Sequence, residues 1–208
     1  VTNAFADVRM AVTPIVVRLA THNRSFAKVL LGALVPALSA DGPEGMHRDV
    51  VRLLRTELAG VLPLVDPSQV FRLLRSPETV VQELGGELLR TNVDPTAMTP
   101  SQLGILASSD VLAVRRTAWT MLSLRIDDVR KDPDAVLPLL DARWEDSRQR
   151  AFTFIENDVG FEHLTPEVAL AVCDSVRPEV QALGRRLVVH RFEHADGLRY
   201  LLRLAQHP

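Results

Sequence analysis

The sequence has little cysteine, little lysine, few aromatic residues and no long apolar run. Its single cysteine, Cys173, excludes an internal disulfide and a zinc site built from several cysteines. The best apolar run, residues 29–38, is far shorter than the ~20 residues that span a bilayer. A secretory leader, with a basic start and a continuous apolar stretch, is also missing. We therefore expect a cytoplasmic chain that does not bind membranes.

Neither sign of charge dominates the composition. There are 24 basic and 26 acidic side chains among 208 residues, which argues against a strongly basic nucleic-acid-binding sleeve. Hydrophobic residues make up 47% and charged residues 24%, a balance typical of folded chains. Strand alternation of useful length, nucleophile elbows, phosphate loops and dinucleotide fingerprints are all missing. The sequence predicts an all-α protein that is not an enzyme and uses no cofactor.

The strongest positive signal is a repeat of 33 residues. Four prolines recur at this spacing: Pro67, Pro100, Pro133 and Pro166. Each follows a residue that caps helices well, in turn Asp66, Thr99, Asp132 and Thr165. Proline is favoured at the first helical position because its missing N–H is not needed there. Each proline is therefore predicted to open a helix, which we call helix A.

A second amphipathic helix, helix B, follows in each repeat. Its small residues share one column, Gly85, Ala118, Ala151 and Gly184, and its leucine-like residues another, Leu89, Leu122, Ile155 and Val188. A column of glycine and alanine predicts that two helices approach closely there, so these four residues are expected to be buried. We interpret Ser76 and Pro77 as the cap and first turn of the first helix B.

The repeats divide the chain into two predicted regions. Residues 1–45 form irregular N-terminal helices over 4–20 and 24–39, broken or bent near Pro14 and Pro36. Residues 46–208 form tandem repeats: a lone helix B over 46–60, then pairs near 67–90, 100–124, 133–156 and 166–192. A last half repeat over 197–206 is rich in leucine. We expect the chain to be a fragment of a longer protein or to self-associate through this end.

Helix B resembles the second helix of HEAT repeats. Residues 110–118 read Asp-Val-Leu-Ala-Val-Arg-Arg-Thr-Ala, with Leu122 after them, and residues 145–151 are similar. Residues 81–85 and 179–184 depart from the pattern. The resemblance implies a right-handed α-solenoid of stacked helix-turn-helix repeats, with the B helices lining its concave face.

One polar column and one mixed column border the apolar stripe of helix B. Gln82, Arg115, Arg148 and Gln181 form the polar column, for which we predict a ladder of hydrogen bonds between neighbouring repeats. Trp119, Phe152 and Arg185 share the mixed column, with outward-facing Arg116, Gln149 and Arg186 beside it. Trp and Arg dominate interface hot spots, so these six residues are the candidate partner-binding surface. Packing of the Trp119 column against the adjacent repeat is the alternative.

Arginine accounts for 22 of the 24 basic residues. Guanidinium groups bind phosphate, so arginines recurring on successive B helices could form a stripe like that of HEAT-like DNA glycosylases. Carboxylates interleave on the same helices, which favours mixed ion pairs instead. We therefore predict a non-catalytic scaffold that binds another protein. Nucleic-acid binding is the alternative, and a regulatory or lyase-type HEAT enzyme a third option without a supporting constellation.

Two further patterns carry a weak chemical signal. Residues 190–194 match His-x-x-Glu-His, an inverted zinc-protease motif, but too little chain follows His194 to supply a third ligand as in those enzymes. We therefore predict no metal site. Cys173 occupies a core column of helix A, so its thiol is predicted to be structural and unreactive.

Overall fold

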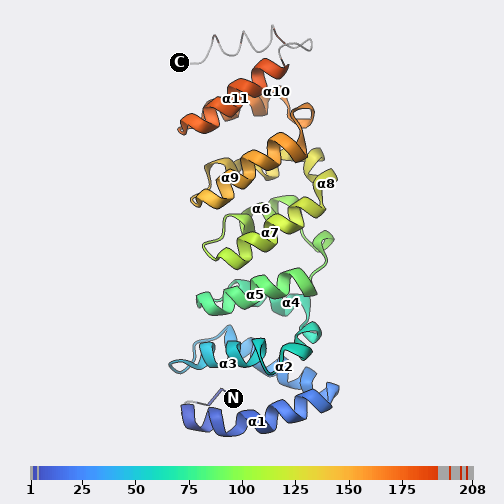
Figure 1. Cartoon of the computed structure of the whole chain (residues 1–208), viewed down its shortest axis with the longest axis vertical. Helices are drawn as coiled ribbons and strands as arrows, with labels where there is room; N and C mark the ends of the chain where they lie inside the picture. The colour runs from blue at the N-terminus through green and yellow to red at the C-terminus, as the bar shows by residue number, and fades with distance from the viewer. Residues whose placement is uncertain (1, 4, 192–196, 198–201, 203–204, 206–208) are drawn as a thin grey trace. The chain divides into compact units, whose positions relative to one another are not determined.

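The structure is a computed structural model that describes residues 2, 3, 5–191, 197, 202 and 205. Every regular element among these residues is helical (Figure 1). The chain divides into two compact units, which are described separately: Val1–Ala97 with Val111–Thr117, and Met98–Asp110 with Ala118–Pro208. The predicted boundary at residue 45 falls inside the first unit.

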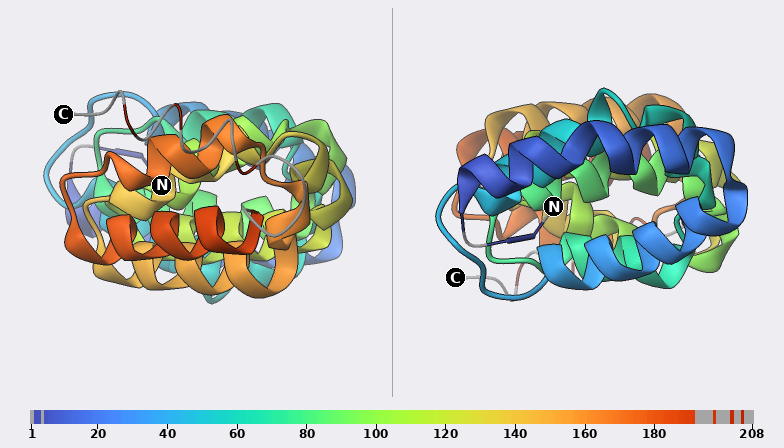
Figure 2. Two further views of the ribbon diagram at one scale, coloured as in Figure 1. Left: turned by 90° about the horizontal axis from the view of Figure 1, so that it is seen from above. Right: turned by 90° about the horizontal axis from the view of Figure 1, so that it is seen from below.

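The first unit contains the N-terminal helices, the first complete repeat and the start of α7. Its elements are α1 (Ala6–His22), α2 (Arg24–Leu38), α3 (Met46–Arg55), η1 (Ala59–Leu64), α4 (Pro67–Leu74), α5 (Thr79–Asn92), η2 (Pro95–Ala97) and the first residues of α7 (Leu112–Leu124). The helices α4 and α5 pack together as the predicted A and B helices. In the right panel of Figure 2, seen from below, α1 and α2 lie side by side.

The second unit contains the remaining repeats. Its elements are α6 (Pro100–Ala107), the end of α7, α8 (Ile126–Lys131), η3 (Pro133–Ala135), η4 (Leu137–Asp141), α9 (Glu145–Thr153), the π-helix η5 (Phe154–Val159), η6 (Phe161–His163), α10 (Pro166–Cys173) and α11 (Pro178–Arg191). The pair α10 and α11 packs as predicted. Seen from above in Figure 2, α9 lies beneath α11 on the same side of this unit. Most of the predicted half repeat over 197–206 lies outside the described residues.

The N-terminal helices are not broken at their prolines, so the expectation of a break there was wrong. Pro14 lies inside α1 and Pro36 in the last turn of α2, and both helices are continuous. Proline removes only one intrahelical hydrogen bond, and the rest of each helix remains bonded. The two helices separate at Asn23, whose side chain caps α2 by accepting a 3.0 Å hydrogen bond from the backbone N–H of Phe26.

Three of the four predicted A helices begin at their prolines. Asp66 and Thr99 each form a capping box with the glutamine three residues later, and Thr165 accepts from the Val168 N–H at 3.3 Å. These caps satisfy backbone donors that the first helical turn leaves without partners.

The third A helix differs from the prediction. Asp132 makes no side-chain cap, and Pro133 opens only the short 3₁₀ turn η3, which is followed by a second 3₁₀ segment, η4. Pro138 lies near the start of η4, where it lacks an N–H and its ring clashes with the carbonyl four residues earlier in an α-helix. A second proline in this repeat therefore explains the missing α-helix.

The small column of helix B is buried in every repeat, as predicted. Gly85, Ala118, Ala151 and Gly184 are all buried. A Cβ atom on Gly85 would lie 3.1 Å from Leu73 Cβ, and one on Gly184 would lie 2.6 Å from the Cys173 backbone nitrogen. In these two repeats the small residue therefore marks the crossing of helices A and B.

The predicted ladder between neighbouring repeats was wrong for three of its four residues. Gln82 Nε2 donates to the Ser76 carbonyl at 2.6 Å, and Gln181 Nε2 donates to the Ser175 carbonyl at 2.8 Å. Arg148 likewise donates to the Ala142 carbonyl at 2.8 Å. Each acceptor lies six residues earlier, in the turn between helices A and B. These side chains therefore brace the turn of their own repeat.

Ser76 and Pro77 do not open the first helix B as expected. The helix α5 begins at Thr79, and its N-cap is Glu78. The Ser76 hydroxyl is buried, accepts from the Glu78 N–H at 3.3 Å and donates to the Leu38 carbonyl at 3.3 Å. Ser76 thus joins the turn to α2 within the first unit.

A buried arginine that the sequence analysis missed joins α1 to α3. The Arg9 side chain is 5% exposed, and its guanidinium donates to Asp49 Oδ2 at 2.9 and 3.2 Å. It also donates to the Asn3 carbonyl at 2.9 Å. A buried charge needs such pairing, because an unpaired one destabilises the fold strongly.

Candidate functional site

The six predicted partner-binding residues are distributed over both units. Arg116 belongs to the first unit, whereas the other five belong to the second. These five are Trp119 on α7, Phe152 and Gln149 on α9, and Arg185 and Arg186 on α11.

Trp119 is a core residue and not an open groove anchor. It is 7% exposed, and its ring lies edge-on to Phe154 with the centroids 5.6 Å apart. Its indole N–H donates to the Ser147 hydroxyl at 3.4 Å, and that hydroxyl donates to the Ala107 carbonyl at 2.6 Å. The sequence left core packing open as the alternative, and the structure places Trp119 there. The hydrogen bonds also explain why Ser147 occurs in a column of valines.

The α9 residues of the predicted surface remain accessible. Gln149 is exposed, and its side chain donates to Glu145 Oε1 at 2.9 Å one helical turn earlier. Phe152 is half-buried, and Thr153 beside it is exposed. This face of α9 offers a half-exposed aromatic ring flanked by polar side chains, a composition suited to a protein partner.

Arg185 and Arg186 border a pocket on α11, here called the α11 pocket. It has a volume of about 480 Å³ and is lined by Phe161, Arg185, Arg186, Val189 and His190. Phe161 comes from η6, and its ring meets the His190 ring edge-on at 5.4 Å between centroids. Val189 is 64% exposed. The α11 pocket thus combines basic side chains with exposed apolar surface.

Two arginines on predicted B helices, Arg186 and Arg55, are already engaged in ion pairs. Arg186 pairs with Glu156 of the preceding repeat. In the first unit, Arg55 of α3 pairs with Glu87 at 2.8 Å and with Glu83 at 3.5 Å, both on α5. These pairs match the mixed-ion-pair interpretation of the arginine content. They leave less positive charge available to a phosphate chain.

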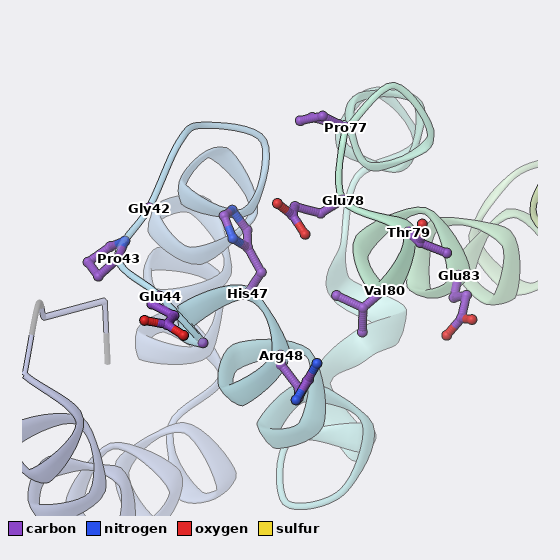
Figure 3. Close-up of a pocket in the computed structure, with 11 residues that line it drawn as sticks. Gly42, Pro43, Glu44, His47, Arg48, Pro77, Glu78, Thr79, Val80 and Glu83 are labelled. Carbon is purple, nitrogen blue, oxygen red and sulfur yellow. The ribbon is translucent and has the colours of Figure 1, made fainter.

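A larger pocket in the first unit was not predicted. It has a volume of about 630 Å³ and is lined by Gly42, Pro43, Glu44, Gly45, His47, Arg48, Pro77, Glu78, Thr79, Val80 and Glu83 (Figure 3). The loop before α3 forms one wall, and Gly45 turns it into the helix with φ 75°, a conformation that favours glycine. The start of α5 forms the other wall. The glycines and prolines of the loop were the available signal, but the opposite wall comes from distant sequence.

The polar groups of this first-unit pocket are open to water. His47 Nε2 lies 2.9 Å from the Ala40 carbonyl, and Figure 3 shows the His47 and Glu78 side chains extending toward each other. Glu44, Glu78 and Arg48 are exposed. Charges of both signs in contact with water are screened, so this pocket selects weakly for the charge of a ligand.

The Cys173 thiol is poorly suited to nucleophilic chemistry. Cys173 is half-buried at the end of α10. Burial is the main cause that raises the pKa of its thiol, the Asp174 charge adds to the rise, and Arg185 opposes it. A raised pKa leaves less of the reactive thiolate at neutral pH.

Among the residues that the structure describes, no group of three or more His, Cys, Asp or Glu side chains is placed to hold a metal ion. Of the His-x-x-Glu-His motif, Glu193 and His194 lie outside the described residues. No helix in the described ranges is long and apolar enough to cross a bilayer.

The α11 pocket is the candidate site, because two of the predicted partner-binding residues, Arg185 and Arg186, line it. Comparison of the chain with protein-family models, with curated proteins and with solved structures gives no match.

Proposed function

We propose that this chain is a non-catalytic scaffold that binds another protein through the exposed faces of its B helices. In this proposal the helix pairs stack as a right-handed, HEAT-like α-solenoid of about 33-residue repeats. The packed pairs α4–α5 and α10–α11 and the buried small column support such a stack, because small residues at one repeat position let helices A and B cross closely.

The observation that carries the proposal is the pairing of Arg186 with Glu156, which joins neighbouring repeats on the candidate surface. The pair leaves a surface of mixed sign beside the half-exposed Phe152. Protein interfaces use such mixed rims around aromatic residues, whereas a phosphate chain requires one sign of charge along its path.

Nucleic-acid binding is the second candidate function. Arg185, Arg186 and His190 surround the α11 pocket next to the Phe161 ring, and basic side chains beside an aromatic ring suit a single nucleic-acid strand.

A cytoplasmic location and self-association through the C-terminal half repeat are part of the proposed scaffold function as well.

Site-specific photo-crosslinking tests the proposed surface. A photoreactive amino acid replaces Gln149 or Thr153 on the B helix α9, or, as matched controls, Ile105 on α6 or Ala171 on α10, which are exposed on A helices. The variants are expressed in the native host, irradiated, and their adducts identified by mass spectrometry.

We expect one protein to be captured from both α9 positions and from neither A-helix position. Equal capture from all four positions, or no protein adduct from α9, contradicts the proposed surface. Adducts to RNA or DNA from α9 support the second candidate instead.

A further inference from the structure

We propose that the α11 pocket binds a short acidic peptide segment of a partner protein, with an apolar side chain seated on Val189 and carboxylates on Arg185. This inference rests on the proposed protein-binding function and names the chemistry of the partner at one place.

The charge at the α11 pocket is the first argument. Arg185 is exposed and makes no ion pair with a carboxylate among the described residues. Its planar guanidinium can therefore bind a carboxylate through two parallel hydrogen bonds. Arg186 also remains accessible, with 54% of its side chain exposed although it pairs with Glu156. The basic side of the pocket can thus accept at least one carboxylate without breaking that pair.

The apolar surface is the second argument. Val189 lies one helical turn beyond Arg185 on α11, and it is 64% exposed in a pocket of about 480 Å³. Phe161 borders the same space from η6 and is half-buried. A leucine-sized side chain would remove this apolar surface from water while an adjacent carboxylate reaches Arg185.

The nearby carboxylates favour a peptide over a phosphate chain. Glu156 pairs with Arg186, and Glu162 lies next to Phe161 in η6 with 69% of its side chain exposed. Both would repel the regularly spaced charges of a nucleic-acid backbone. A peptide can place its few carboxylates at Arg185 and avoid Glu162.

Fluorescence anisotropy with the intact chain tests this inference. The probe is a fluorescein-labelled peptide of Asp, Glu and Leu residues, compared with a peptide in which Lys replaces the acidic residues and with a labelled oligothymidylate. The variants are Arg185→Glu, Val189→Ser and the control Arg24→Glu. Arg24 is an exposed arginine at the start of α2 in the first unit, so its replacement changes the net charge equally.

We expect Arg185→Glu to weaken binding of the acidic peptide about tenfold or more, and Val189→Ser about threefold. Arg24→Glu should change it less than about twofold, because Arg24 does not line the pocket and an exposed charge is screened by salt. Circular dichroism melting establishes that each variant is folded. The lysine peptide should bind Arg185→Glu better than it binds the unchanged chain.

Equal losses from Arg185→Glu and Arg24→Glu would overturn the inference, because attraction by net charge alone predicts them. Unchanged binding in Arg185→Glu would also overturn it, as would tighter binding of the oligothymidylate that depends on Arg185. Photo-crosslinks from Gln149 and Thr153 are independent of these results. If they form while the peptide result is negative, only the peptide inference fails.

Discussion

The two units solve the same packing problem with opposite residues at one repeat position. Gly86 in the first unit and Trp119 in the second share a column of helix B, directly after the small column. A Cβ atom on Gly86 would lie 2.7 Å from the Val114 backbone nitrogen, and the Gly86 carbonyl accepts from the Thr117 hydroxyl at 2.8 Å. Trp119 instead fills its space with an indole against Phe154 and Ser147.

The contrast between Gly86 and Trp119 indicates that the space available between neighbouring B helices differs at these two positions. Where the backbones of α5 and the start of α7 meet, no side chain fits at Gly86. Between α7 and α9, the Trp119 ring and the buried Ser147 hydroxyl fill the space. The column is buried at Gly86 and Trp119, where the local packing decides the size of the residue, but it is half-buried at Phe152 and exposed at Arg185.

The largest effect on stability is expected at Trp119. Trp119→Ala should lower the free energy of unfolding by about 3–5 kcal/mol, because it opens a cavity and leaves Phe154 without its ring partner. Trp119→Phe keeps an aromatic ring and should destabilise by less than about 2 kcal/mol. Urea unfolding measures both. A small effect of Trp119→Ala on stability with a large effect on partner binding would return Trp119 to the binding surface.

Added side-chain volume at Gly86 should destabilise the fold. Gly86→Ala should destabilise by about 1–3 kcal/mol, since its new methyl group meets the α7 backbone, which cannot move aside as a flexible side chain can. The matched control is Gly32→Ala on α2, where a Cβ meets nothing within 4 Å. It should stabilise by about 0.5–1 kcal/mol through helix propensity. Stabilisation by both substitutions would refute the close approach of α5 and α7.

A smaller effect on stability should distinguish the capped start of α6 from the uncapped start of η3, both in the second unit. Thr99→Ala should destabilise by about 1 kcal/mol, because it removes the capping box of α6. Asp132→Ala should change stability by less than about 0.5 kcal/mol, because Asp132 makes no cap. The two variants are compared by thermal unfolding at neutral pH. Equal losses would indicate a capped helix at Pro133.

The smallest expected effect is the pH dependence of stability, which should differ between the caps of α4 and α6. A side-chain hydrogen bond with Ser68, the largest cause, and the Ser68 backbone N–H lower the pKa of the Asp66 carboxyl in the folded state. The stability from this carboxylate is therefore complete above the unfolded pKa of about 3.9 and is lost as the pH falls through the folded value. Thr99 does not titrate, so the α6 cap lacks this dependence.

The variant Asp66→Asn keeps a capping side chain but removes the titration. Its stability difference from the unchanged chain should shrink as the pH falls below about 4, which chemical unfolding at a series of pH values measures. A difference that stays constant over the acid range would mean that the Asp66 charge adds nothing to the cap.

Local chemistry made the start of most A helices predictable. At Pro67, Pro100 and Pro166 the residue before the proline caps the helix, and the groups involved are at most three residues apart. The small column was predictable for a related reason, since side chains repeated at one face of successive helices must meet the same neighbouring element. At Pro133 the same pattern failed because Pro138, five residues later, is incompatible with the interior of an α-helix.

Only the tertiary structure decided which groups meet across elements. Gln82 and Gln181 hydrogen-bond to the turns of their own repeats, and Trp119 lies inward. The α11 pocket joins α11 to η6, and the first-unit pocket joins a loop to a helix start more than thirty residues away. Periodicity specifies the face of a helix on which a side chain lies, but the partner of that face depends on helix spacing and turn geometry. Those distances are set by the packing of residues far apart in the chain.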